Sequence, residues 1–165
     1  MLVIGIDPGT ASTGYGLVRE NGGGSLEAID YGVIETSSKL PISERLSVIY
    51  HRLVELSNLH RPDSGAVEKL FFQRNVRTAI SVGQGRGVAM LALAETNVGI
   101  TEYTPLEVKQ AVTGYGKADK NQIQQMVKAL LLLKEIPKPD DAADALAVAI
   151  CHIHSAKSKR LYENG

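Results

Sequence analysis

Apolar and polar positions follow different periods along this chain, and the changes of period predict its elements. The first apolar run, residues 2–7, is apolar at nearly every position, which is typical of a central strand covered on both faces. Two more strands are predicted over residues 13–19 and 25–35. The three glycines at 22–24 predict a hairpin turn between them and therefore antiparallel pairing.

Beyond residue 35, apolar residues recur at helical spacing and alternate with short strand patterns. A capping box at Thr104-Pro105-Leu106-Glu107 opens one helix, and Asp119 caps another. Helices are also predicted over residues 43–60, 76–97 and about 140–156, with strands over 65–69 and 98–103. This order predicts an α/β fold, a mixed five-stranded sheet with helices on both faces. Residues 1–156 form one predicted domain, and 157–165 a polar tail that we expect to fray.

Acidic residues stand at positions where this fold would bring them together. Asp7 ends the first strand, just before the turn sequence Pro8-Gly9-Thr10, and Glu68 lies in the short strand Ala66-Val67-Glu68. If those strands are parallel neighbours, both acids reach the same edge of the sheet. Asp141 and Asp144 are three residues apart, so they project from one helix face. Carboxylates in such a cluster predict a site for hard cations such as Mg²⁺.

Each acid also has a structural interpretation. Asp7 could cap its turn, and Glu68 could belong to a satisfied ion pair, although an unpaired acid on a buried strand is costly. Asp140 and Asp141 could simply favour the positive end of their helix. Because Asp140 is four residues from Asp144, spacing alone does not choose between Asp140 and Asp141.

Composition is that of an ordinary globular protein: 165 residues, 44% hydrophobic, 22% charged and no net charge. The charge is uneven, because residues 69–134 hold nine Lys and Arg against four acids, a local +5. No apolar stretch approaches the roughly 20 residues of a membrane span, and no basic segment precedes the first apolar run. The single Cys151 has apolar neighbours and is predicted to be a core residue. We expect a cytoplasmic location and no membrane partner.

Two groups of residues in the basic region are suited to contacts with nucleic acid. Exposed aromatic side chains next to arginines can stack on bases or wedge between them, and lysines beside a flexible Gly114-Tyr115-Gly116 loop can contact phosphates. The alternatives are that the aromatic residues belong to the core and that the lysines form a solvated face. The residues concerned are Phe71, Phe72, Arg74, Arg77, Lys109, Lys117 and Lys120.

Three glycines, Gly83, Gly85 and Gly87, interrupt a predicted helix, and each costs about 1 kcal/mol relative to Ala. Close packing should offset that cost, either inside the chain or against a second subunit. The four histidines show no spacing that converges with the acids and are interpreted as structural or surface residues. His152 is a minor candidate because it lies on the last helix.

At these residues the chain resembles the bacterial RuvC-type Holliday junction resolvases. The matching segments are GIDPGTASTGYG, AVEKLFFQRN, QGRGVA, VKQAVTGYGKADKNQIQQMV and DDAADALAVAICH, in family order over essentially the whole chain. The resemblance implies an RNase H-like fold and a homodimer that cuts four-way DNA junctions by symmetric nicks. It also implies that the catalytic acids are Asp7, Glu68, Asp141 and Asp144, and so selects Asp141 over Asp140.

The resemblance further implies that Phe71 or Phe72 opens the junction centre, that Lys109 and Lys120 lie near the scissile strand, and that a branch-migration helicase complex is a partner. Our hypothesis is a nuclease of recombination and repair with two Mg²⁺ or Mn²⁺ ions among the four acids. A water activated there attacks the scissile phosphate, Lys120 or Lys109 stabilises the developing charge, and the products carry 5′-phosphate and 3′-hydroxyl ends.

Two other functions are compatible with the early motifs. A strand followed by Asp-x-Gly-Thr and a hairpin also binds ATP phosphates in actin-like and sugar-kinase-like ATPases. Those proteins need a second lobe and a second glycine-rich phosphate loop, neither of which this sequence contains. The other alternative is a non-catalytic module on the same fold that binds junctions or RNA. Metal-dependent nicking of a four-way junction distinguishes that module from the enzyme.

Overall fold

The computed structural model describes residues 1–69 and 76–163. The strands are β1 (Leu2–Asp7), β2 (Ser12–Glu20), β3 (Leu26–Glu35), β4 (Ser64–Glu68) and β5 (Ile100–Tyr103). The helices are α1 (Ile42–His60), α2 (Val76–Glu95), α3 (Pro105–Thr113), α4 (Lys120–Leu130) and α5 (Asp140–Glu163). This order agrees with the sequence-based prediction, with boundaries shifted by one or two residues in most cases.

The five strands form one mixed sheet in the order β3-β2-β1-β4-β5. β1 pairs antiparallel with β2 and parallel with β4, and β4 pairs parallel with β5. The predicted hairpin joins β2 to β3, which are antiparallel. β1 is therefore the central strand, as its continuous apolar sequence predicted, and it lies between partners of opposite direction.

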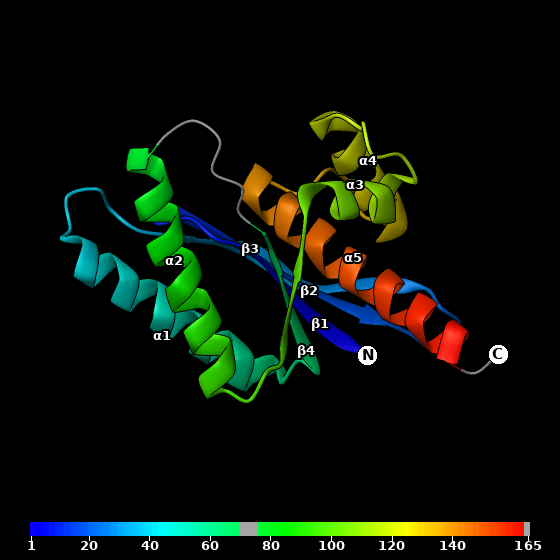
Figure 1. The fold of residues 1–165 in the computed structure, drawn as a ribbon, viewed down its shortest axis with the longest axis horizontal. Coiled ribbons are helices and arrows are strands. Elements are labelled where there is room, and N and C mark those ends of the chain that lie inside the picture. The colour runs from blue at the N-terminus through cyan, green and yellow to red at the C-terminus, as the bar shows by residue number, and fades with distance from the viewer. Residues whose placement is uncertain (70–75, 164–165) are drawn as a thin grey trace.

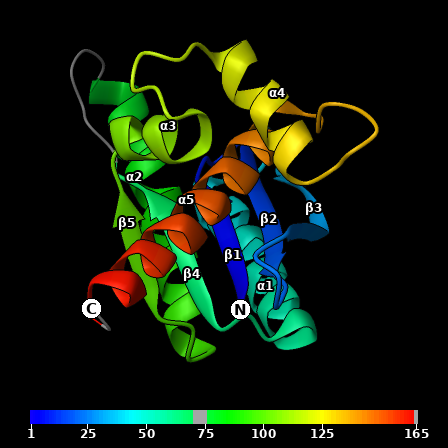
Figure 2. The same ribbon diagram turned by 90° about the vertical axis from the view of Figure 1, so that its right-hand side faces the viewer.

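Helices cover both faces of the sheet, as predicted (Figure 1). On one face α1 and α2 pack on large apolar side chains that include Ile4, Ile6 and Leu17. On the other face α5 crosses the sheet in front of β1 and β4 (Figure 2), and α3 and α4 pack on α5. Alternation along β1 directs Val3, Gly5 and Asp7 to the α5 face.

Glycines in the sheet allow α5 to lie close to β1 and β2. A Cβ atom at Gly5 would stand 2.1 Å from the carbonyl oxygen of Ala145, and one at Gly14 would stand 2.0 Å from that of Asp141. At Gly16 it would meet Leu146 at 2.8 Å. Gly5 and Gly16 are direct partners in the β1–β2 pairing, so these glycines form a smooth strip on which the alanine-rich helix rests.

The capping predictions for α3 and α4 are confirmed. Thr104 and Asp119 each accept from the backbone N–H three residues on, and the residues at those positions, Glu107 and Gln122, accept from the caps in return. The last helix was predicted too short, because α5 continues to Glu163 instead of fraying after residue 156. Residues 157–163 contain neither Gly nor Pro, so nothing in that segment stops a helix. Within the described residues, no helix has both the length and the apolar character needed to cross a membrane.

Candidate active site

The pairing of β1 with β4 brings Asp7 and Glu68 to the same edge of the sheet. Ile6 pairs with Val67 in the parallel register, so the next residue on each strand is acidic. Both side chains are half-buried and line one cavity of about 220 Å³. The predicted adjacency of the two strand-terminal acids is therefore confirmed by the strand order.

α5 adds two more carboxylates at this edge. Oxygen atoms of Asp7, Asp141 and Asp144 all lie within 4.8 Å of one another. The close approach of α5 to Gly14, which pairs with Asp7 across β1 and β2, places the first turn of the helix over the end of β1. Glu68 lines the same cavity as Asp7 and Asp144 but does not belong to the tight triad.

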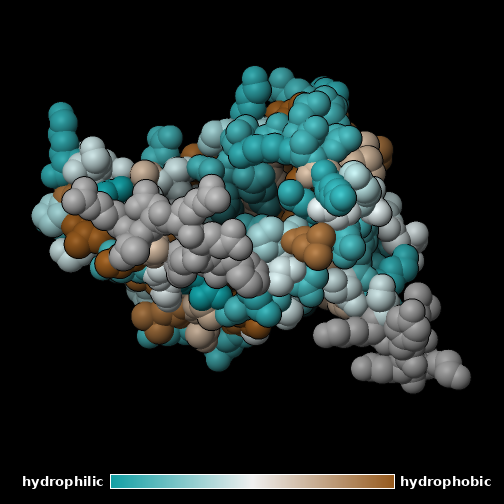
Figure 3. Space-filling model, turned by 45° about the horizontal axis from the view of Figure 1, so that its top comes forward, coloured by the Kyte–Doolittle hydropathy of each residue, from teal (hydrophilic) through white to brown (hydrophobic). Residues whose placement is uncertain are grey.

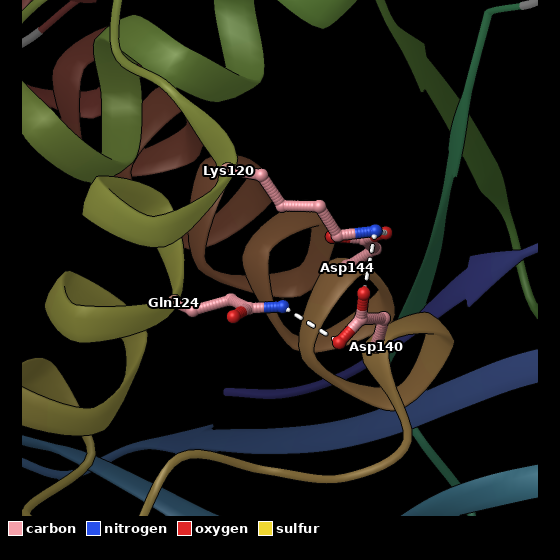
Figure 4. Close-up of polar contacts among 4 residues, drawn as sticks. All are labelled: Lys120, Gln124, Asp140 and Asp144. Atoms are coloured by element: carbon pink, nitrogen blue, oxygen red, sulfur yellow. Dashed lines mark hydrogen bonds and ion pairs between the residues drawn. The ribbon is translucent and has the colours of Figure 1, made fainter.

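Asp140, which spacing could not separate from Asp141, has a different position. Its exposed carboxylate pairs with the Lys120 ammonium at 3.1 Å and accepts from the Gln124 amide at 3.0 Å. The same ammonium lies 3.2 Å from Asp144, so Lys120 bridges the two acids (Figure 4). The structure thus groups Asp141 with Asp7 and Asp144, and leaves Asp140 on the rim as a partner of Lys120.

Burial and mutual repulsion disfavour the ionised forms of Asp7, Glu68 and Asp144. Burial, followed by the charges of Asp144, Asp141 and Glu68, raises the pKa of Asp7 from 3.8 to about 7. The pKa of Glu68 is raised by burial and by the charge of Asp144. Burial also raises the pKa of Asp144, while Lys120 opposes that shift. Such a cluster has too much negative charge for its surroundings and would be stabilised by added positive charge.

The donor set fits a hard divalent cation. Carboxylate oxygens are the protein ligands that Mg²⁺ and Mn²⁺ favour, and one or two carboxylates for each ion are sufficient because water completes the shell. Asp7, Asp141 and Asp144 could hold such an ion, with Glu68 in reach of the same cavity. None of these positions offers the sulfur or imidazole ligands that are typical of zinc sites.

Basic and apolar residues form the rest of the cavity wall. Lys109 from α3 and Lys120 from α4 line the cavity with the acids, and the Lys109 charge opposes the upward shift in the pKa of Glu68. The remaining wall is apolar and comes from α3, α4 and α5: Pro105, Val108, Ile123, Ala147 and Val148. The surface over α3 and α4 is mainly hydrophilic (Figure 3), and Lys117 is exposed on the loop that joins them.

Several of the predicted DNA contacts lie outside the described residues. Phe71, Phe72 and Arg74 fall in the segment 70–75, and the side chain of Arg77 is likewise outside the described part of the chain. The assignment of a wedge to either phenylalanine stays a prediction.

The residues that position the acids were not recognised from the sequence as part of the site. Gly14 and Gly16 were assigned to a strand, and Asp140 was treated only as a competitor of Asp141. A signal was present, because glycines two apart on a strand share one face and mark close approach of another backbone.

The other candidates have structural roles. His152 is buried and shares hydrogen bonds with Ser64 Oγ and Tyr103 Oη, each at 2.9 Å. Cys151 is buried in the core, and burial raises the pKa of its thiol to about 12. Of the three helical glycines, Gly85 packs inside the chain, while an added Cβ at Gly83 or Gly87 would meet, within 4 Å, no atom of the described residues beyond its own stretch of helix. A second subunit at those two glycines stays a prediction.

Comparison with known proteins gives one consistent match. The family model described as "Crossover junction endodeoxyribonuclease RuvC" matches residues 3–152. A protein of that name from Caldicellulosiruptor saccharolyticus is 57% identical over 158 residues, which cover 96% of this chain and 95% of the relative. One from Desulfitobacterium hafniense is 59% identical over 155 residues, covering 94% and 93% of the two chains.

Solved structures agree with the sequence match. RuvC from Thermus thermophilus superposes with a TM-score of 0.90 at 38% identity, covering 96% of this chain and 97% of that one. The same protein in complex with a Holliday junction substrate gives a TM-score of 0.92 at 38% identity and covers 96% of each chain. The yeast mitochondrial Holliday junction resolvase Ydc2, at 16% identity and a TM-score of 0.71, shares the fold.

Proposed function

The chain belongs to the RuvC family of crossover junction endodeoxyribonucleases, and from this premise we propose how its carboxylates cut four-way DNA. It is a structure-selective endonuclease that resolves Holliday junctions, and a nuclease of this family uses divalent metal. The observation that carries the proposed mechanism is the convergence of Asp7, Asp141 and Asp144 within 4.8 Å.

We assign the metal-binding role to these three carboxylates and to Glu68. Two Mg²⁺ or Mn²⁺ ions held there would activate a water molecule and neutralise charge on the phosphate during in-line displacement. The protein contributes fixed positions: β1 and β4 present Asp7 and Glu68 from the sheet, and α5 presents the other two acids. Hydrolysis would leave 5′-phosphate and 3′-hydroxyl ends, which can be ligated.

Lys109 and Lys120 are proposed to contact the phosphate that is cut. Both line the cavity beside the acids, where an ammonium can stabilise charge that develops on phosphate oxygens. Lys120 is held by Asp140 and Asp144 in the structure, so its ammonium already lies at the site. Lys117 and Arg77 would also contact the DNA. In the segment outside the described residues, Arg74 is expected to do the same, and Phe71 or Phe72 is expected to open the junction centre.

The proposal includes a homodimer, since two sites are needed for paired symmetric nicks in one junction. Its support within the chain is the outer surface of α1 and α2, where Leu59, Ile80 and Leu91 are large apolar side chains with more than half of their area exposed. We further propose that a branch-migration helicase complex delivers the junction. The proposed location is the cytoplasm, where such DNA occurs in a bacterium.

The test of the mechanism is Asp7→Asn in a cleavage assay on a synthetic four-way junction. Loss of one anionic ligand should reduce nicking by at least about 1,000-fold with Mg²⁺, while junction binding is retained because the cavity becomes less negative. Linear duplex and RNA are the substrate controls, and Asp140→Asn is the matched variant that should keep metal binding. Nicking by Asp7→Asn at the rate of the unchanged protein would reject the mechanism. A chain that binds junctions but never nicks them would be the non-catalytic module.

A further inference from the structure

We propose that Ser81 and Gly85 of α2 are positioning residues that hold the Asp7 carboxylate in its metal-binding place, acting through the turn at residues 8–11. The inference rests on the proposed role of Asp7 as a metal ligand. Neither residue lines the cavity that holds the acids, so any effect of theirs on metal binding must pass through that turn.

Two contacts join α2 to the turn that follows Asp7. Ser81 Oγ shares a hydrogen bond of 2.5 Å with Thr10 Oγ1, and the Thr10 side chain is almost fully buried. One helical turn further on, the backbone of the buried Gly85 lies against Gly9, and a Cβ atom built at Gly85 would stand 3.3 Å from the carbonyl carbon and oxygen of Gly9. α2 therefore contacts the two residues that lie second and third after Asp7.

The turn is held from its other sides as well. Thr13 Oγ1 donates to the Gly9 carbonyl oxygen at 2.5 Å. Thr36 donates its hydroxyl to the Thr10 carbonyl oxygen and its backbone N–H to the Ala11 carbonyl oxygen, and Arg45 from α1 in turn donates to the Thr36 hydroxyl at 2.8 Å. These bonds leave the turn little room to retreat from α2, so pressure from the helix would displace the backbone near Asp7.

The fit at Gly85 is tight enough for a single methyl group to matter. At 3.3 Å, an alanine Cβ would require Gly9 or α2 to shift by a few tenths of an ångström. Pro8, whose φ is fixed by its ring, lies between Gly9 and Asp7 and transmits such a shift instead of absorbing it. Metal sites and catalytic groups must be held within about 0.5 Å of the productive geometry. Glycine at this helical position thus keeps Asp7 in place, although alanine would form the helix better.

The matched experiment compares Gly85→Ala with Gly87→Ala. Both variants add one methyl group to the same helix, but in the part of the chain that the structure describes the methyl at residue 87 would meet no atom within 4 Å outside the adjoining turns of its own helix. We expect Gly85→Ala to bind Mn²⁺ about three- to tenfold more weakly in isothermal titration calorimetry, with junction cleavage reduced by a similar factor at subsaturating metal. Gly87→Ala should match the unchanged protein in Mn²⁺ affinity; because a second subunit is predicted to lie against Gly87, cleavage by this variant is compared only at equal dimer content. The mass in solution is measured for each variant, so that a change of assembly is recognised.

Ser81 gives a second and independent test. Ser81→Ala removes the hydroxyl that contacts Thr10 and should weaken Mn²⁺ binding about threefold, whereas Ser81→Thr keeps a hydroxyl and should restore binding to within twofold. A purely structural role would lower the urea midpoint and leave the Mn²⁺ affinity of the folded protein unchanged. Unchanged Mn²⁺ affinity in both Gly85→Ala and Ser81→Ala would overturn the inference.

Failure of this inference can be separated from failure of the proposed mechanism. If the unchanged protein binds Mn²⁺ and Asp7→Asn does not, the role of Asp7 stands, and the α2 variants alone decide the inference. If Asp7→Asn binds Mn²⁺ as well as the unchanged protein does, the metal role of Asp7 fails first, and the inference fails with it.

Discussion

The two faces of the sheet are packed in different ways. Under α1 and α2, large side chains fill the space, and Ile4, Ile6, Ile49, Leu53 and Leu93 are fully buried. Under α5, glycines in β1 and β2 meet alanines and helix backbone, and the two backbones nearly touch. The α5 face also buries large side chains, Leu146, Ile150 and Ile153, but its glycines bring the helix close enough to place its carboxylates over a strand end.

This difference separates stability from function within one small domain. The apolar core under α1 and α2 tolerates substitution, because side chains of similar volume can repack. The α5 face tolerates less, since a Cβ added to a glycine there meets backbone atoms that cannot rotate away. We therefore expect substitutions on the two faces to have distinct signatures: lost stability on one face, and lost geometry of the acids on the other.

The largest effect is expected for Gly14→Ala. Its Cβ would stand 2.0 Å from the Asp141 carbonyl oxygen, so the first turn of α5 must move by about 1 Å or more. A displacement of that size should lower junction cleavage by at least about 100-fold. Cleavage is measured beside urea unfolding, with Gly22→Ala at the open hairpin tip as the control variant. Cleavage within twofold of the unchanged protein would show that α5 does not depend on this glycine.

Leu53→Ala is the counterpart on the other face. Leu53 is fully buried beneath the sheet, and its truncation leaves a cavity that should lower the free energy of unfolding by about 2–5 kcal/mol. Cleavage per folded molecule should stay within about twofold at a temperature well below the new melting point. Both quantities come from denaturant titration and an assay on the same preparation. A large fall in cleavage by fully folded protein would mean that the two faces are coupled.

Neutralising Asp7 in metal-free protein is expected to raise the free energy of unfolding, by less than Leu53→Ala lowers it. The pKa of Asp7 is raised to about 7 in the folded state, so between about pH 4 and 7 unfolding releases a proton and stability falls as pH rises. Asp7→Asn should remove that dependence and raise the free energy of unfolding at pH 8 by about 1–3 kcal/mol. Urea unfolding in EDTA at pH 5 and pH 8 measures it. Equal stability of the two proteins at both pH values would contradict the raised pKa.

Much of the fold follows from local signals. The apolar run of residues 2–7 identified the central strand and the glycines at 22–24 identified the hairpin. The capping box at Thr104 and the cap at Asp119 located the starts of α3 and α4. The end of α5 could not be predicted, because no residue stops the helix. Nor could the sequence show which of the three glycines in α2 packs inside the chain, since that depends on where the turn after Asp7 lies.

The site was predictable in part for the same reasons. Asp7 and Glu68 meet because β1 and β4 are parallel neighbours, which the strand order allowed us to expect. The choice between Asp140 and Asp141 could not come from spacing, because both lie near Asp144 on the helix. It depends on the rotation of α5 about its axis, which Gly14 fixes through a contact remote in sequence.

The hydrogen bonds of His152 add a constraint on length. His152 ties α5 to the start of β4 through Ser64 and to the end of β5 through Tyr103, eight residues after Asp144. With a rise of about 1.5 Å per residue, that interval spans about 12 Å of helix. An insertion or deletion of one residue would rotate one end by about 100° against the other. The number of residues between Asp144 and His152 therefore fixes how the acids of α5 are oriented relative to β4 and β5. Insertions and deletions in this helix are expected only outside that interval.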